Sequence, residues 1–123
     1  MSISESIYIA VVDDDESFCR SFARLLRAAG MQPITYASAE AFLADSKHPR
    51  FDCLVLDVNL DGMSGIELGQ RLAAEGRVAP FICITSADEP GLRAQAEAAG
   101  CAAFFRKTDS GAVVLEAIRR LTH

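Results

Sequence analysis

The sequence predicts an α/β fold in which five β-strands alternate with five α-helices and form one parallel sheet between helical layers. Short apolar runs of strand length alternate along the chain with longer segments whose apolar residues recur at helical spacing. The first, third and fourth short runs are nearly all apolar, which is typical of strands covered on both faces. Strict alternation with right-handed crossovers then places parallel strands between helices.

The strands are predicted from apolar runs that end at polar or turn-forming residues. They are expected at residues 7–12, 32–36, 52–56, 81–84 and 102–106. The second run is the weakest of the five, whereas the third ends directly at Asp57 and the fourth follows Pro80. A helical segment follows each run, so the whole chain consists of five βα units.

The helices are predicted from apolar periodicity together with capping residues. The first, third and fourth are expected over about residues 16–29, 65–75 and 91–99. Ser38 is the expected N-cap of a short second helix, and Ser110 that of the last helix. Glycines are expected to end the first, third and fourth helices: Gly30, Gly76 and Gly100.

Length and charge limit the class of protein. The 123 residues fit a single domain, which we expect to cover residues 1–123. The net charge of −5 argues against a nucleic-acid surface and against docking on an anionic membrane. The first apolar run stops at three aspartates, so it is too short for a signal peptide or a membrane span. We therefore expect a cytoplasmic protein that binds neither nucleic acid nor membrane directly.

The cysteines and histidines show no pattern of metal ligands. The four cysteines are scattered without a C-x-x-C pair: Cys19, Cys53, Cys83 and Cys101. Cys53 and Cys83 lie in apolar runs, where cysteine acts as a small hydrophobic residue and suits a reducing compartment. His48 and His123 have no partner pattern, and we expect both at the surface.

Polar side chains follow four of the five predicted strands. They are aspartates after the first and third strands, hydroxyls after the fourth and a lysine after the fifth: Asp13, Asp14, Asp15, Asp57, Thr85, Ser86 and Lys107. Taken singly, an aspartate after a strand is more often a turn former, and Asp14 or Asp15 can simply cap the first helix. Ligands of open parallel sheets, however, bind beyond the carboxyl ends of the strands, and the joint placement indicates a site there.

This combination of groups suits phosphoryl chemistry with a metal ion. Packed carboxylates repel one another unless one is protonated or a cation joins them. Mg²⁺ takes oxygen ligands and is commonly held by one or two carboxylates plus substrate phosphate. A carboxylate beside such a metal can attack phosphorus and form an aspartyl phosphate. Thr85 and Lys107 can then bond the phosphoryl oxygens.

The order and spacing of these residues resemble the receiver domains of two-component response regulators, over essentially the whole chain. VVDDDES resembles the first-strand acidic motif, LVLDVNLDGMSGIEL the phosphorylation-site motif, ICITS the switch-hydroxyl strand, and AGCAAFFRK the strand that ends at the family's lysine. The resemblance implies a flavodoxin-like, doubly wound (βα)5 fold with strand order 2-1-3-4-5.

The resemblance also implies roles for individual residues. Asp57 would accept a phosphoryl group from a sensor histidine kinase or a phosphotransfer protein. Asp14 and Asp57 would bind Mg²⁺ directly, Asn59 through its backbone carbonyl and Asp13 mainly through water. The domain would be no enzyme beyond catalysing its own phosphorylation and dephosphorylation, with Lys107 assisting.

A switch toward downstream partners is implied as well. Thr85 would move toward the phosphoryl group, and Phe104 would move inward behind it. The face made of the fourth helix, fifth strand and fifth helix would then change its preference for an output protein or domain, or for a phosphorylation-linked dimer. Phe104 and Phe105 are adjacent on a strand, so we expect one in the core and the other more exposed.

Two positions depart from the family's pattern. Asp61 stands where the family usually has proline, and it places another acid near the pocket. Thr108 replaces the proline that usually follows the lysine through a cis bond. A cis bond before a residue other than proline costs about 2.5–4 kcal/mol, so we predict a trans Lys107–Thr108 bond, which leaves Lys107 free to be displaced. Met63 lies near Asp57 and either covers the site or fills a gap.

Three other functions were weighed. A haloacid-dehalogenase-type phosphatase needs an acid two residues after its nucleophile, where this chain has Asn59. A flavodoxin-like cofactor binder needs a glycine-rich phosphate loop after the first strand, which is missing. The alternative that stays open is a degenerate receiver that acts as a phosphorylation-independent interaction module. The output is also open: SFARLLRAAG and YASAEAFL resemble receivers attached to helix-turn-helix outputs, but a stand-alone regulator is equally consistent.

Overall fold

The computed structural model describes residues 6–76, 79–86 and 89–122. Five parallel strands form one sheet in the order β2-β1-β3-β4-β5, which is the predicted order. Neighbouring strands are in regular register, for example Val11 beside Val55 and Leu56 beside Cys83. The strands are β1 (Tyr8–Val12), β2 (Gln32–Tyr36), β3 (Cys53–Asp57), β4 (Phe81–Thr85) and β5 (Ala103–Arg106). Their ends differ from the predicted ones by at most one residue.

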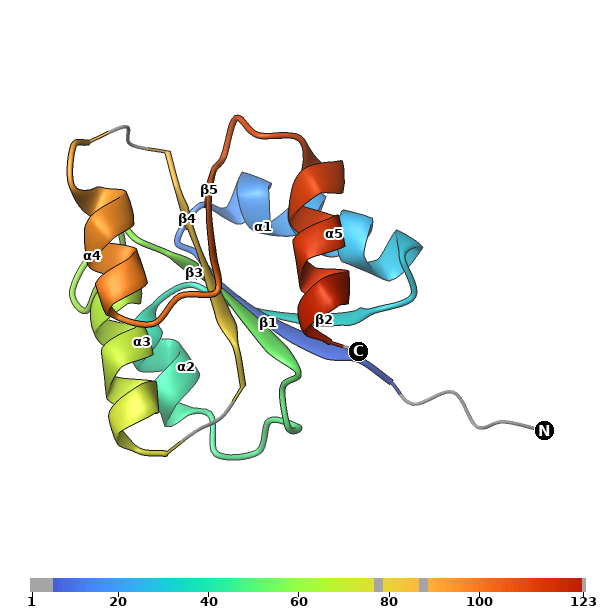
Figure 1. Ribbon diagram of the computed structural model, residues 1–123. Coiled ribbons are helices and arrows are strands. Elements are labelled where there is room, and N and C mark those ends of the chain that lie inside the picture. Colours follow the sequence, from blue (N-terminus) through green and yellow to red (C-terminus); the bar gives the residue numbers. More distant parts are fainter. Residues whose placement is uncertain (1–5, 77–78, 87–88, 123) are drawn as a thin grey trace.

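Helices cover both faces of the sheet (Figure 1), with α1 and α5 on one face and α2, α3 and α4 on the other. They are α1 (Glu16–Ala28), α2 (Ala39–Ala44), α3 (Gly65–Ala74), α4 (Leu92–Ala98) and α5 (Gly111–Leu121). None of the helices in the described part of the chain is long and apolar enough to cross a membrane.

The helix ends follow local sequence signals. The hydroxyl of Ser38 accepts a hydrogen bond from the Ala41 N–H at 2.9 Å, so it is the predicted N-cap of α2. The glycines expected to end α1, α3 and α4 all have positive φ angles, between 76° and 99°. A reciprocal capping box between Ser64 and Glu67 begins α3, a signal that the sequence interpretation did not use.

Two apolar cores lie on opposite faces of the sheet because side chains alternate along each strand. On β3, Leu54 and Leu56 belong to the core under α2, α3 and α4, whereas Cys53 and Val55 belong to the core under α1 and α5. Every residue of β3 and β4 is buried, so polar groups can be placed only where these strands end.

The edge strand β5 is packed less completely. Phe104 contacts the core under α4 and Phe105 contacts the core under α5, so the two rings face opposite sides as predicted. Both are half-buried, and the expectation that one would be core and the other more exposed was wrong. The reason is that β5 has a neighbouring strand on one side only, so its other edge is not covered by the sheet.

The remaining predictions concern cysteines and histidines. Cys53 and Cys83 are buried as expected, and burial raises the pKa of the Cys53 thiol to about 12. His48 is half-buried and packs against the rings of Phe42 and Phe51, with ring centroids 5.5 and 4.8 Å away, so its predicted surface position was wrong. The segment after α2 folds back over this aromatic cluster, which no local pattern indicates. His123 lies outside the described residues.

Candidate functional site

Three aspartates meet where β1 and β3 end. Each of Asp13, Asp14 and Asp57 offers a carboxylate oxygen, and these oxygens lie within 4.8 Å of one another. Asp13 and Asp57 are almost completely buried, with 2% and 3% of their surface exposed, whereas Asp14 is exposed. One edge of the sheet therefore holds a compact acidic pocket with two buried acids and one that reaches solvent.

The three consecutive aspartates after β1 have three different tasks. The Asp13 carboxylate accepts a hydrogen bond from the Asp15 N–H at 2.8 Å. Asp15 is the N-cap of α1, because its carboxylate accepts the Phe18 N–H at 3.1 Å. Asp14 has neither of these contacts, and its carboxylate contributes to the acidic pocket. The thiol of Cys19 donates to the Asp13 carbonyl at 3.3 Å and ties the first turn of α1 to the end of β1.

Asp57 is held by the loop that follows it. Its carboxylate accepts the Asn59 N–H at 2.9 Å. The start of α3 lies directly on its backbone, because a Cβ atom added at Gly65 would come within 2.3 Å of the Asp57 carbonyl oxygen. Only glycine fits there without a shift of the backbone. The sequence interpretation placed Gly65 at a loop-to-helix boundary but did not recognise this close approach.

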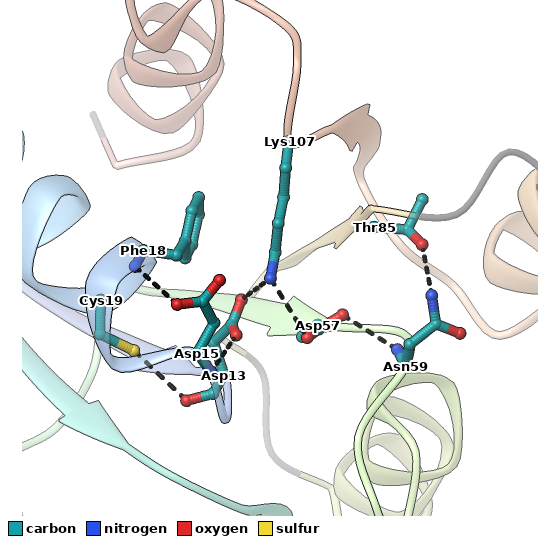
Figure 2. A network of polar contacts seen from close by, with 8 residues as sticks. All are labelled: Asp13, Asp15, Phe18, Cys19, Asp57, Asn59, Thr85 and Lys107. Carbon is teal, nitrogen blue, oxygen red and sulfur yellow. Dashed lines mark hydrogen bonds and ion pairs between the residues drawn. The ribbon is translucent and has the colours of Figure 1, made fainter.

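Lys107 reaches into the acidic pocket from the end of β5 (Figure 2). Its Nζ lies 2.8 Å from Asp13 Oδ2 and 3.5 Å from Asp57 Oδ2. The Lys107–Thr108 peptide bond is trans, as predicted. Burial by itself lowers the pKa of Lys107, but Asp13 and Asp57 outweigh this effect, so the pKa is raised and the ammonium stays charged. The lysine therefore neutralises part of the pocket and lies closer to Asp13 than to Asp57.

The buried carboxylate of Asp13 retains unused capacity. No donor in the described ranges reaches its Oδ2 atom with hydrogen-bond geometry, although Lys107 lies close as an ion pair. Burial and the charge of Asp57 raise the pKa of Asp13 to about 6, against the lowering effects of Lys107 and the Asp15 N–H. Clustered carboxylate oxygens with spare lone pairs fit a hard cation such as Mg²⁺.

Thr85 lies on the side of Asp57 opposite to Asp13 (Figure 2). Thr85 is completely buried, and its hydroxyl accepts a hydrogen bond from the Asn59 side-chain amide at 2.8 Å (Figure 2). This side-chain contact was not predicted, because the family resemblance implied a role only for the backbone carbonyl of Asn59. The guanidinium of Arg93 lies 4.9 Å from the centre of the Phe104 ring, outside the acidic pocket.

The other residues near the site are at its margin. Asp61 is exposed and does not join the acidic cluster found among the described residues. Met63 is half-buried against the core under α2, α3 and α4, so it fills a gap, and its N–H donates to the Glu40 carboxylate at 3.0 Å. Ser86 is exposed at the end of β4.

The comparison with protein families agrees with this geometry. The sequence model of the response regulator receiver domain family matches residues 9–119. The chain belongs to this family. The acidic cluster of a receiver domain is where Mg²⁺ typically binds, and receiver domains interact with histidine kinases and output domains in two-component signal transduction.

Individual relatives place the receiver in regulators of greater length. The chain is 34% identical over 119 residues to the response regulator protein TmoT of Ectopseudomonas mendocina, covering 97% of this chain and 54% of TmoT. It is 34% identical over 115 residues to the transcriptional regulatory protein FixJ of Azorhizobium caulinodans, covering 94% and 54%. The chain therefore spans about half the length of these relatives.

Solved structures show the same fold. A response regulator receiver protein from Burkholderia phymatum superposes with a TM-score of 0.83 at 38% identity, over 95% of both chains. The crystal structure named FixJ-N gives a TM-score of 0.86 at 33% identity, over 97% of this chain and 95% of that one.

Proposed function

We propose that this receiver domain takes a phosphoryl group onto Asp57 from a phosphohistidine of a sensor histidine kinase or a phosphotransfer protein. A bond forms between an Asp57 carboxylate oxygen and phosphorus, and the bond from phosphorus to the donor's imidazole nitrogen breaks. The observation that carries the proposal is the buried Asp57 carboxylate, with Asp13 and Asp14 oxygens within 4.8 Å and the Lys107 ammonium at 3.5 Å.

The residues around Asp57 fit a Mg²⁺ site. Asp14 and Asp57 would hold the ion directly, Asn59 through its backbone carbonyl and Asp13 through water. When bound, the ion supplies positive charge that offsets the charge of the transferring phosphoryl group. Lys107 supplies the second positive charge, because its ammonium already lies between Asp13 and Asp57 and can bond a phosphoryl oxygen.

The switch would begin at Thr85. Its hydroxyl is bonded to the Asn59 amide in this structure, and a phosphoryl group on Asp57 offers it stronger, charged acceptors. Movement of Thr85 would make room for the Phe104 ring, which is half-buried on β5. The face formed by α4, β5 and α5 would then change its affinity for an output protein or domain, or for a second copy in a phosphorylation-linked dimer.

We further propose that residues 1–123 form one receiver domain that works in the cytoplasm and binds neither nucleic acid nor membrane directly. Its catalytic power would be limited to phosphorylation and dephosphorylation of its own Asp57. The net charge of −5 supports the absence of nucleic-acid contacts by this chain.

The test is intact mass after incubation with acetyl phosphate, with and without Mg²⁺. Wild type should gain one phosphoryl group only with Mg²⁺, and Asp57→Asn should gain none. The matched control is Asp61→Asn, which changes an exposed acid four residues away and should be phosphorylated like wild type. A folded wild type that gains no mass and binds no beryllofluoride would instead be a degenerate receiver.

A further inference from the structure

Lys107 has a third neighbour besides the two carboxylates. Its Nζ lies 4.7 Å from the centre of the Phe18 ring, on the α1 side of the pocket (Figure 2). Only 15% of the lysine side chain is exposed. The face of an aromatic ring is negative and attracts a cation within about 6 Å, most strongly where water is excluded. The ammonium is thus held by Asp13, Asp57 and Phe18 together.

The ring of Phe18 is itself fixed in place. Its backbone N–H donates to the capping carboxylate of Asp15, which sets the first turn of α1. The ring stacks on Phe22 one turn later, with centroids 5.4 Å apart and planes 12° from parallel. Phe22 is buried with 5% of its surface exposed, so the Phe18 ring rests on the core beneath α1. Phe18 is therefore a firm support for a flexible side chain.

Lys107 needs such a support because other places are open to its ammonium. A cleft of about 230 Å³ between α1 and α5 borders Lys107, with Phe18, Ser21, Leu25 and Asp109 in its wall. The carboxylate of Asp109 lies on the same loop as Lys107 and accepts the Arg106 N–H at 2.9 Å. A lysine without the ring could turn into this cleft, toward solvent and the charge of Asp109. Residue 108 is threonine and not proline, so no pyrrolidine ring restricts the backbone directly after Lys107.

We propose that Phe18 is a positioning residue that keeps the Lys107 ammonium between Asp13 and Asp57 through the attraction of its ring face. The kinetic consequence of this inference rests on the proposed function, because Phe18 would position the positive charge of Lys107 that stabilises the transferring phosphoryl group. Its structural consequence, the place of the ammonium, can be measured without phosphorylation.

The experiment separates the charge distribution of the ring face from the size of the side chain. Pentafluorophenylalanine incorporated at position 18 reverses the charge of the ring face while nearly keeping its size. Phe18→Leu removes the ring, and Phe18→Tyr keeps it. The matched control is pentafluorophenylalanine at position 22, because Phe22 lies on the same helix and in the same ring stack, whereas the cation–π contact with Lys107 is made by Phe18. The readouts are the phosphorylation rate constant with acetyl phosphate and Mg²⁺, and the chemical shifts of the Lys107 ε-methylene protons.

We expect the fluorinated ring at position 18 and Phe18→Leu to slow phosphorylation by about 3- to 10-fold, the size of a partly desolvated cation–π contact. Phe18→Tyr and the control at position 22 should stay within about twofold of wild type. In wild type the ring current should shift the Lys107 protons upfield, and the shift should vanish in Phe18→Leu and shrink with the fluorinated ring at position 18.

Three outcomes would overturn the inference in different ways. Equal rates and unshifted Lys107 protons in all variants, with wild type phosphorylated normally, would remove Phe18 from the site and leave the proposed function intact. A wild type that takes no phosphoryl group would remove the proposed function and the kinetic part of this inference with it. A slow rate in Phe18→Leu alone, with the fluorinated ring unaffected, would reduce Phe18 to a packing residue.

Discussion

The centre of the sheet and its β5 edge are built differently. All ten residues of β3 and β4 are buried, whereas no residue of β5 is, and α4 beside it buries only Ala96. Asp57 and Thr85 end the two central strands, and Lys107 follows the edge strand. The site therefore joins a well-packed part of the molecule to a weakly packed one.

This difference indicates how such a site can both hold geometry and transmit change. The carboxylates keep fixed positions because they extend from strands covered on both faces. Elements with few buried contacts cost less free energy to shift, so β5 and α4 can respond to a new charge at Asp57 without disturbing the core. The predictions below test this division, from the largest expected effect to the smallest.

Matched phenylalanines on the two kinds of strand give the largest contrast. Phe81 on β4 is 6% exposed, whereas Phe105 on β5 is half-buried. Phe81→Ala should lower the free energy of unfolding by about 4 kcal/mol, because it leaves a cavity in the core. Phe105→Ala should cost about 2 kcal/mol, since less of its ring is removed from water. Urea unfolding of both variants measures the difference, and equal losses would contradict the division.

Matched glycines at the two ends of α3 compare a position packed against the centre of the sheet with one that faces open space. Gly65→Ala should cost about 3 kcal/mol and impair phosphorylation, because the added methyl group would collide with the backbone of Asp57. Gly76→Ala at the end of the same helix meets open space and should cost only about 1 kcal/mol, from its positive φ of 76°. Unfolding by urea gives the energies and acetyl phosphate labelling the activity. If Gly65→Ala kept the stability and labelling of wild type, the start of α3 would have to shift away from Asp57 at little cost in free energy.

The acidic pocket should destabilise the rigid centre at neutral pH. The pKa of Asp13 is raised from 3.8 to about 6, so the folded state binds more protons than the unfolded state between these values. Stability from this group is therefore highest below about pH 4 and falls as pH rises to about 6. Two pKa units correspond to about 3 kcal/mol of stability. Replacing Asp13 by a neutral residue would recover only part of this free energy, because it also removes the stabilising ion pair with Lys107.

Asp13→Asn should accordingly raise the free energy of unfolding by about 1 kcal/mol at pH 7.5 in EDTA, and the gain should vanish near pH 4. The exposed Asp61→Asn should show no such dependence on pH. Urea unfolding at the two pH values is the measurement. A variant less stable than wild type at pH 7.5 would mean that the ion pair with Lys107 outweighs the burial of the charge.

The smallest effect concerns the outer face of β5. Arg93→Ala removes the guanidinium that lies 4.9 Å from the Phe104 ring and should cost about 0.5 kcal/mol or less. Freed from this contact, Phe104 should turn inward more readily, so beryllofluoride binding should tighten by about twofold. Arg71→Ala, which breaks an exposed pair with Glu75, is the control and should leave that affinity unchanged. Weaker binding in Arg93→Ala would show that the contact favours the inward position.

Much of the fold and of the site's composition could be predicted because the signals are local. Apolar runs, capping serines and terminal glycines mark each element within a few residues of itself. The rule that ligands bind at the carboxyl ends of parallel strands then brings Asp13, Asp57 and Lys107 together without any calculation of packing. The trans bond before Thr108 was predictable for the same reason, since it depends on two adjacent residues.

The predictions that were wrong and the contacts that were not predicted depend on how side chains from distant parts of the chain point toward one another. Nothing near His48 indicates that it packs against the rings of Phe42 and Phe51. The close approach of Gly65 to Asp57 and the bond from Asn59 to Thr85 depend on how the loop after β3 folds over the sheet edge. The half-burial of both rings on β5 depends on how incompletely its neighbours cover an edge strand.

By itself, the sequence determined the βα order, the strand boundaries and the set of groups that collect at one edge, since periodicity and turn chemistry act within a few residues. Only the tertiary structure decided which of the three consecutive aspartates is buried, which caps α1 and which joins the acidic pocket from an exposed position. It also decided that Lys107 lies between Asp13, Asp57 and the Phe18 ring. These outcomes depend on burial and on charges brought together from β1, α1, β3 and β5, which no single segment contains.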